Sequence, residues 1–445
     1  MNQMKLPTTS DIVSMWHSSG LKEKLIFTFL MIAVFRFGTQ IPVYGINSQV
    51  IANLASGNNI IGFLDLFSGG ALGKVSIFAL GIGPFITASI IMQLLAVVIP
   101  YLENLQKEEG EAGRRKISQY TRVATVFLAL FQSFIILTYL VNNPVALLPG
   151  VNANMFFIQA MLSLTAGSVF IMWLAELITE KGVGNGGSLL IFVGIISGIP
   201  VYIERTSQLV GMDPGKQFGL FLLMTIFLAT VVLIVIMQEA IRKVIIVNAK
   251  RQVGNKIYGG GNTHIPFKLN PGGVMPIIFA MAMLLFPVTV LGIVGQANLP
   301  VGPIKDIVTF LSMDLFNPSK FPYYVIYFSL IVALSFFYAS IMPNMQPKEI
   351  ANNLKKYGSS IPGIRPGKPT AEAIDKILSR IIFIGAFALG IIALVPNIAV
   401  ALTGITTFQG IGATSLIIMV GVAIDFVNQV KTHLLANHYE GFLKQ

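Results

Sequence analysis

The sequence contains no cysteine and little charge. Because none of the 445 residues is a cysteine, neither a disulfide nor a cysteine-ligated metal site can form. Charged residues make up only 11% of the chain and hydrophobic residues 54%, whereas soluble domains are roughly 25% charged. This composition excludes an ordinary soluble domain and predicts a polytopic membrane protein.

Residues that carry catalytic or nucleotide chemistry are also scarce. No Walker A sequence is present, so nucleotide-driven work must belong to a partner. Gly182, Gly184 and Gly187 fit G-x-G-x-x-G, but they lie in a short turn between apolar segments, without the strand that a dinucleotide site needs. The four histidines stand in predicted loops or tails at no metal-ligand spacing: His17, His264, His433 and His438. We therefore expect no catalytic residue, metal or cofactor, and no enzymatic activity.

Hydropathy predicts an all-α protein with ten transmembrane helices, since about 20 apolar residues cross a bilayer. The N-terminus lacks the apolar core of a signal peptide, so the first span is expected to direct its own insertion. The expected spans lie near 25–42, 75–98, 123–141, 155–178, 186–203, 218–238, 273–295, 323–342, 378–396 and 410–430.

The segment before the second span is apolar but too short to cross a membrane. Residues 61–73 are broken by glycine, and the span that follows is itself interrupted by Gly81, Gly83 and Pro84. Irregular backbone at membrane depth is tolerated only where protein or a water-filled cavity satisfies its polar groups. We therefore expect residues 61–73 to form a re-entrant segment that closes a path lined by the second span.

Lysine and arginine give the orientation. Of the 30 basic residues, 24 fall on the side of the two termini, 5 fall on the opposite side, and Arg36 lies within the first span. The positive-inside rule then places both termini in the cytoplasm.

Two cytoplasmic loops are unusually long for a compact protein. The loop at about 239–272 alternates β-branched and basic residues around a glycine turn, which predicts a protruding basic hairpin. The loop at about 343–377 predicts a short helix, a Pro/Gly-rich tip around Arg365 and an amphipathic entry to the ninth span. The ordinary positive-inside bias would explain why these loops are positively charged but not why they are so long. We expect them to be docking surfaces for a cytosolic partner.

A weak internal repeat indicates two inverted five-helix halves, 1–203 and 204–445. The pattern G-x-x-P-x-I occurs at 81–86 in the second span and at 273–278 in the seventh. Paired Gly/Pro-interrupted spans at corresponding positions point to a path between the halves, although chance matches are common in membrane helices.

Polar residues within the spans are few, and each is better explained by helix packing or an interfacial position than by transport: Arg36, Gln93, Glu176, Asp425 and Gln429. The residues expected near the middle of the membrane are instead aliphatic.

Four long runs carry a resemblance to a known family: FSGGALGKVSIFALGIGPFITASIIMQLL, EEGEAGRRKISQYTR, ITEKGVGNGGSLLIF and NNLKKYGSSIPGIRPGKPTAEAID. They closely resemble the SecY family, the channel subunit of the bacterial protein translocon, in the same order and spacing over nearly the whole chain. The resemblance implies ten spans in two inverted halves with a hinge between spans 5 and 6. It also implies a multi-pass protein of the bacterial plasma membrane.

The resemblance also implies site residues. The aliphatic pore ring falls on Ile82, Ile86, Ile191, Ile278 and Ile418, and its sixth position falls on Gly187, which departs from the bulky aliphatic residue that the family usually has. The plug falls on about 61–73, with Phe63, Leu64, Leu66, Phe67, Gly69 and Gly70. Spans 2 and 7 would bound the lateral gate, with Pro84 and Pro276 as flex points.

The implied partners are SecE-like and SecG-like small membrane subunits, a SecA-like motor ATPase, the ribosome, signal sequences with their nascent chains, and membrane lipids. Arg365 resembles the family's main contact with the motor and the ribosome, and further basic residues would support docking: Lys355, Lys356, Lys250, Arg251 and Arg242. The implied function is a partner-driven, protein-conducting channel. It would translocate unfolded polypeptides and release membrane helices laterally.

Two other functions remain open on the residues alone. A secondary transporter built from inverted repeats would need a polar site near the midplane, such as Arg36 or Gln93 facing an unwound segment. A membrane scaffold would need no conduction. Solute uptake by vesicles distinguishes the transporter from a protein channel. Electrophysiology with and without a plug deletion distinguishes the scaffold from a protein channel.

Overall fold

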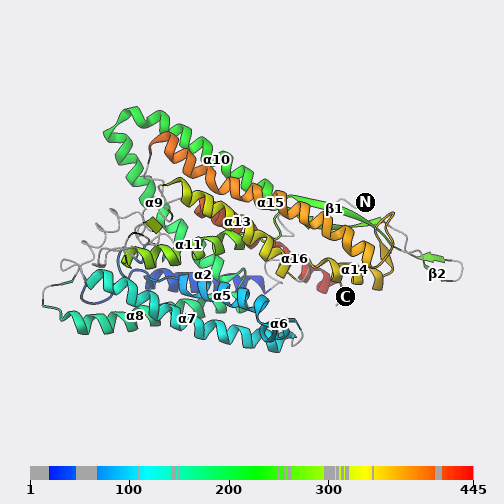
Figure 1. Ribbon diagram of the computed structural model, residues 1–445, viewed down its shortest axis with the longest axis horizontal. Coiled ribbons are helices and arrows are strands. Elements are labelled where there is room, and N and C mark those ends of the chain that lie inside the picture. The colour runs from blue at the N-terminus through cyan, green and yellow to red at the C-terminus, as the bar shows by residue number, and fades with distance from the viewer. Residues whose placement is uncertain are drawn as a thin grey trace. The chain divides into compact units, whose positions relative to one another are not determined.

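The computed structural model describes residues 20–46, 68–107, 110–141, 147–148, 150–248, 251–253, 256–258, 262–294, 306, 310–311, 315, 320–342, 345–405 and 413–443. Ten helices in this part of the chain correspond to the ten predicted spans (Figure 1). Their bounds are α2 (Leu21–Gly38), α5 (Gly83–Val98), α7 (Gly110–Val141), α8 (Ala153–Lys181), α9 (Gly186–Met212), α10 (Gln217–Glu239), α11 (Met275–Val294), α13 (Phe321–Ile341), α15 (Lys368–Thr403) and α16 (Ala413–Leu443).

Smaller elements lie between these helices. α6 (Pro100–Lys107) precedes α7, the 3₁₀ helix η1 (Pro214–Lys216) precedes α10, and α14 (Pro347–Lys356) precedes α15. The strands are β1 (Ile241–Asn248), β2 (Arg251–Val253), β3 (Lys256–Tyr258), β4 (Asn262–Lys268) and β5 (Ser359–Ser360).

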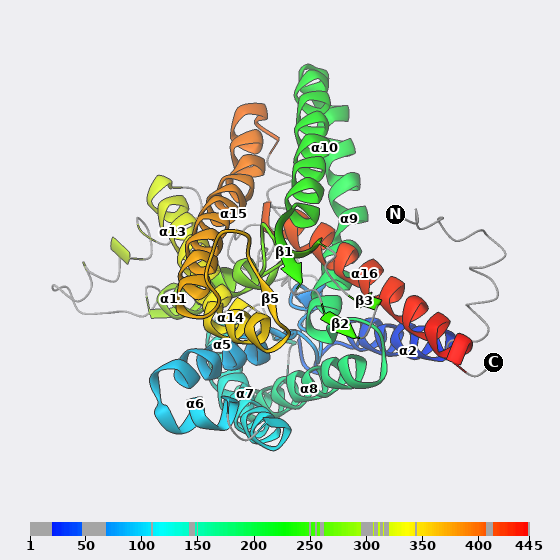
Figure 2. The same cartoon turned by 90° about the vertical axis from the view of Figure 1, so that its right-hand side faces the viewer.

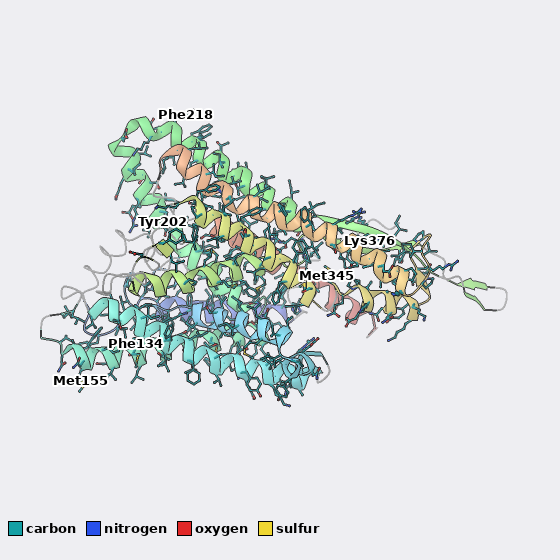
Figure 3. The ribbon with its side chains drawn as sticks, viewed as in Figure 1. Phe134, Met155, Tyr202, Phe218, Met345 and Lys376 are labelled. Carbon is teal, nitrogen blue, oxygen red and sulfur yellow. The ribbon has the colours of Figure 1, made fainter. Side chains whose placement is uncertain are left out.

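Seven of these helices are long and apolar enough to cross a membrane by length and composition, and two shorter apolar helices begin at Gly83 and Met275. The long helices carry many exposed apolar side chains. Phe218, at the start of α10, is one of them (Figure 3). Apolar exposure of this extent is unusual for a protein in water but expected for helices surrounded by lipid. The chain is therefore an all-α, multi-pass membrane protein.

Several helices differ from the predicted spans: α7 begins at Gly110 rather than near 123 and α15 at Lys368 rather than near 378, and the first two spans differ as well. The first helix covers Leu21–Gly38 rather than 25–42, because the chain becomes extended at Pro42, which bridges Ser76. The second is helical only from Gly83. Residues before it form turns, with positive φ at Val75 and Gly81.

The chain packs as two compact units. Unit 1 comprises 1–209, 282–318 and 422–445, and unit 2 comprises 210–281 and 319–421. The division between the units falls within helices α9, α11 and α16. The division of the sequence into halves 1–203 and 204–445 stays a prediction.

Unit 1 has an apolar core between α7, α8 and the non-helical residues 43–46 and 72–80. Its fully buried members include Leu137, Ala160 and Leu164, packed with Val75 and Val43. Phe78 stacks between Phe35 of α2 and Phe170 of α8, with centroid distances of 6.2 and 5.8 Å. This core fixes the residues that precede α5.

Unit 2 contains an antiparallel sheet in the order β4-β1-β5, covered by α14 and the start of α15 (Figure 2). β1 pairs with β4 from Ile241↔Lys268 to Val247↔Asn262, which confirms the predicted hairpin. Val244 and Ile246 alternate inward and pack with Phe267, Leu354 and Ile374. The long cytoplasmic loops thus share a small core of their own.

Close packing of α8 against the segment before α5 requires a glycine. A Cβ atom at Gly167 would collide with the carbonyl oxygen of Ile77, which belongs to the backbone and has little freedom to move. We expect Gly167→Ala to lower the free energy of unfolding by about 1–3 kcal/mol, the usual cost of overpacking. Thermal unfolding of the purified protein in detergent measures the change. Gly211→Ala is the control, since nothing lies within 4 Å of its Cβ position, and an equal loss in both variants would contradict the assigned contact.

Candidate pore and docking surface

The predicted ring residues all lie near the N-terminal ends of helices. Ile82 immediately precedes α5 and Ile86 lies in its first turn, Ile191 lies in the second turn of α9, and Ile278 and Ile418 lie near the starts of α11 and α16. Four of them are buried, with exposed fractions of 0–4%, and Ile86 is half-buried. None of these side chains can form a hydrogen bond with water or a peptide.

The structure brings three ring positions together within unit 1. A Cβ atom at Gly187 would lie 3.6 Å from Cδ1 of Ile82, so the glycine faces that isoleucine, and Ile191 follows one turn later on α9. A Cβ atom there would also lie 3.3 Å from Oδ1 of Asn185, so Gly187 is already closely approached at the position where the resemblance implies an aliphatic side chain. Ile278 and Ile418 belong to unit 2, and their approach to the others stays a prediction.

The internal repeat has the same backbone conformation in both copies. Gly81 and Gly273 are left-handed, with φ of 56° and 59°, and a helix starts two residues after each. The carbonyl of Gly81 accepts a hydrogen bond from Ser168 Oγ at 3.4 Å, and that of Gly273 accepts one from Asn270 Nδ2 at 2.7 Å. The repeated sequence pattern therefore forms the same structure twice: a left-handed glycine with a hydrogen-bonded carbonyl, two residues before a helix.

Pro84 and Pro276 are the second residues of α5 and α11. A proline in the first turn does not kink a helix, because its missing N–H would have no intrahelical partner there. The two prolines therefore define where the helices begin, and conformational freedom lies with the preceding glycines. Their role as flex points of a gate stays a prediction.

The glycine-rich turn between α8 and α9 uses its backbone amides within the protein. The N–H of Val183 donates to Thr28 Oγ1 at 3.0 Å, that of Gly184 to Gln429 Oε1 at 2.8 Å, and that of Gly186 to Thr179 Oγ1 at 2.8 Å. A phosphate-binding loop would instead present free amides to its ligand. These bonds place the start of α9, and with it Gly187 and Ile191.

Most polar residues of the spans also have partners within the protein. Glu176 pairs with Arg122 Nε at 2.9 Å and joins α8 to α7. Gln93 contacts Ser89 one turn earlier at 3.4 Å, and Arg36 donates to the carbonyl of Gly69 at 3.0 Å. Among the described residues, no group of three or more His, Asp or Glu could hold a metal ion. The described spans thus favour packing roles for these polar groups.

Part of the predicted plug lies outside the described residues, namely Phe63, Leu64, Leu66 and Phe67. Its end is described: Gly69 and Gly70 have φ of 70° and 82°. Gly69 is buried and Gly70 is exposed. Ser197 of α9, which sequence reasoning did not single out, also donates to the carbonyl of Gly69, at 3.4 Å.

The predicted docking residues lie on the sheet and helices of unit 2. Arg242, Lys355, Lys356 and Arg365 are exposed, and in the described part of the chain none of them pairs with a carboxylate. Thr370 Oγ1 donates to the carbonyl of Arg365 at 2.8 Å, which fixes the loop tip against the start of α15. Arg251 lies in β2, and Lys250 lies outside the described residues. Lys376 extends the basic surface along α15 (Figure 3).

Comparison with known proteins agrees with this architecture. A solved structure described as "The structure of a protein conducting channel" matches with a TM-score of 0.68 at 16% identity, covering 98% of this chain and 96% of that one. Sec61 in the canine ribosome–channel complex matches with a TM-score of 0.64 at 15% identity, covering 98% and 96%. The fold is therefore that of the protein-conducting channels.

Sequence comparison identifies the family. The SecY family model matches residues 76–427. The protein translocase subunit SecY of Synechococcus elongatus is 44% identical over 99% of this chain and 98% of its own length, and that of Thermotoga maritima is 40% identical over 96% and 95%. The chain belongs to the SecY family of protein translocase subunits, as the sequence runs predicted.

The two left-handed glycines provide a direct test of the repeated device. A left-handed residue with a side chain costs about 1–2 kcal/mol relative to glycine, so Gly81→Ala and Gly273→Ala should each lower the free energy of unfolding by that amount. Gly83→Ala is the control, since it lies in a helix with nothing within 4 Å of its Cβ position. Thermal unfolding in detergent measures all three. If both variants have the same free energy of unfolding as the control, the two turns do not require a left-handed glycine.

Proposed function

We propose that the chain forms the protein-conducting channel through which unfolded polypeptides cross the membrane and from which membrane helices leave sideways into lipid. The aliphatic character of the predicted ring carries this proposal. A narrow constriction of isoleucines dewets and excludes ions. It also offers a sliding peptide no hydrogen-bonding partner, as passage of unrelated sequences requires.

Of the proposed ring residues, Ile82, Ile86 and Ile191 lie in unit 1, and Ile278 and Ile418 lie in unit 2. The family resemblance assigns α5 and α11 to the lateral gate.

A signal sequence would supply free energy for opening. Each leucine that moves into lipid gains about 0.3–0.6 kcal/mol, so a run of about ten supplies several kcal/mol. Such a helix entering between α5 and α11 would be stabilised by lipid on its outer face. The left-handed glycines before both helices are the positions at which the backbone can adjust with least steric cost.

The work of translocation would come from outside the chain. We propose no catalytic activity for it, and assign a SecA-like motor ATPase or the ribosome to the exposed basic surface around Arg365. SecE-like and SecG-like subunits would cover lipid-exposed helices. With both termini in the cytoplasm, as the basic residues predict, this surface faces the cytosol. The positive charge of this surface suits an anionic partner such as ribosomal RNA.

The polar residues of the spans argue against the secondary transporter. Glu176, Gln429 and Arg36 form hydrogen bonds to protein groups, whereas a transporter uses such residues for its solute or coupling ion. The channel is therefore the better-supported function.

The ring is tested by its seal. We expect Ile86→Ser combined with Ile278→Ser to raise ion leakage through vesicles that contain the purified complex, because hydroxyl groups allow water to enter the constriction. Ile203→Ser combined with Ile384→Ser is the control, since both isoleucines are more than half exposed on helices of the respective units. Ion flux from loaded vesicles measures the leak. If vesicles with Ile86→Ser and Ile278→Ser leak no more ions than the unaltered complex, the constriction lies elsewhere.

The docking surface is tested by charge reversal. We expect Arg365→Glu to weaken binding of the motor ATPase by about tenfold or more, since it replaces attraction by repulsion at the contact, and to abolish motor-dependent export at unchanged protein level. Arg380→Glu, an equally exposed arginine farther along α15, should retain export. Binding to channel-containing vesicles and secretion of a reporter measure the two effects. Unchanged motor binding by the Arg365 variant would remove this residue from the contact.

A further inference from the structure

Arg36 is a charged residue within a transmembrane helix that the channel function does not explain. It lies in the last turn of α2 and is half-buried. A charge in this position is costly unless it is paired or reaches water. Its guanidinium Nη1 donates to the carbonyl oxygen of Gly69 at 3.0 Å, across 33 residues of sequence.

A second side chain converges on the same carbonyl. Ser197 Oγ of α9 lies 3.4 Å from the Gly69 oxygen and 2.6 Å from the carbonyl oxygen of Gly194. A carbonyl oxygen has two lone pairs, so it can accept from both residues, but the serine hydroxyl has one hydrogen and shares it with the closer Gly194 carbonyl, so its contact with Gly69 is the weaker one. One backbone group at the end of the plug is thus held from two helices that are far apart in the sequence.

The backbone around Gly69 fits this contact tightly. Gly69 has φ of 70°, and a Cβ atom there would lie 3.0 Å from Cα of Gly194 and 3.4 Å from Nη1 of Arg36. Only glycine combines this conformation with such an approach. The next residue, Gly70, is also left-handed, but nothing lies within 4 Å of its Cβ position. The fixed point is therefore at Gly69.

Beyond Gly70 the chain is anchored independently of Arg36. The N–H of Val43 donates to the carbonyl of Val75 at 3.0 Å, and the N–H of Ile77 donates to the carbonyl of Ile41 at 3.0 Å. These bonds hold the connection to α5. Removing Arg36 or Ser197 would therefore release the end of the plug and leave the start of α5 in place.

We propose that Arg36 and Ser197 form a latch on the carbonyl of Gly69, which holds the plug in the resting channel and sets how often the channel opens without a signal sequence. Both are positioning residues that act through the plug. The proposal rests on the channel function proposed above. Since the guanidinium is charged, its bond to Gly69 is the stronger of the two.

The test is the resting conductance of planar bilayers that contain the purified complex, normalised to the conductance with a saturating signal peptide. Arg36→Met keeps the length of the side chain and removes its donors, and should raise the resting open fraction by about tenfold or more. Arg36→Lys retains a charged donor and should restore most of the closure. Ser197→Ala should raise the open fraction less than Arg36→Met does.

Two control variants separate the latch from general effects. Lys74→Met removes a nearby positive charge that bonds Gln40 rather than Gly69, and Ser163→Ala removes a helix serine bonded to the carbonyl of Gln159. Both should match the unaltered protein. A resting open fraction of Arg36→Met equal to that of the unaltered protein overturns the latch, as does a rise that Arg36→Lys does not reduce.

The remaining outcomes are also decisive. If Arg36→Met does not assemble, an unchanged resting conductance of Ser197→Ala overturns the latch and a raised one supports it. The unaltered protein shows separately whether the channel proposal holds. If signal peptide opens no conductance even there, the channel function fails, whereas normal opening with no effect of either latch variant refutes the latch alone.

Discussion

The described backbone that leads into α5 is the constraint on which the rest of this structure depends. Residues 69–82 are mostly apolar and largely buried but not helical, so their amides and carbonyls need partners within the protein. These amides and carbonyls form hydrogen bonds with the extended residues 41–43, with serine side chains in or next to the segment itself, and with Arg36, Ser168 and Ser197. An irregular segment satisfied in this way can end in a plug and still lead into a membrane-spanning helix.

The predicted pore is apolar because the nearby polar side chains form hydrogen bonds within the protein. Polar side chains such as Gln429, Thr28 and Thr179 fix the turn before α9, and isoleucines occupy the predicted ring positions. Gly187 is the exception, because it contributes no side chain and a Cβ atom there would lie 3.3 Å from Asn185 Oδ1 and 3.6 Å from Ile82 Cδ1. Selectivity in such a constriction depends on width and dryness instead of specific contacts.

Sequence reasoning predicted the elements whose signal is local. Long apolar runs gave ten helices, and alternating residues around glycines gave the β1–β4 hairpin, which the structure confirms. It misplaced the ends of α2 and the start of α5, because the extended pairing of Pro42 with Ser76 joins residues 34 positions apart and leaves no periodic pattern. It also treated Arg36 as a packing or interfacial residue without identifying Gly69 as its partner. Ser197 carried no signal at all, since a serine in an apolar helix usually bonds its own backbone.

What the sequence by itself determined is the class of molecule: a multi-pass helical protein of the SecY family, with its orientation, its long basic loops and an aliphatic set of candidate pore residues. Hydrophobicity and charge are properties of each segment, so they can be read without coordinates. Only the tertiary structure decided which polar groups meet at Gly69, that the two prolines begin their helices, and that Gly187 faces Ile82. Those facts depend on close approach between distant segments, which packing of the whole chain selects.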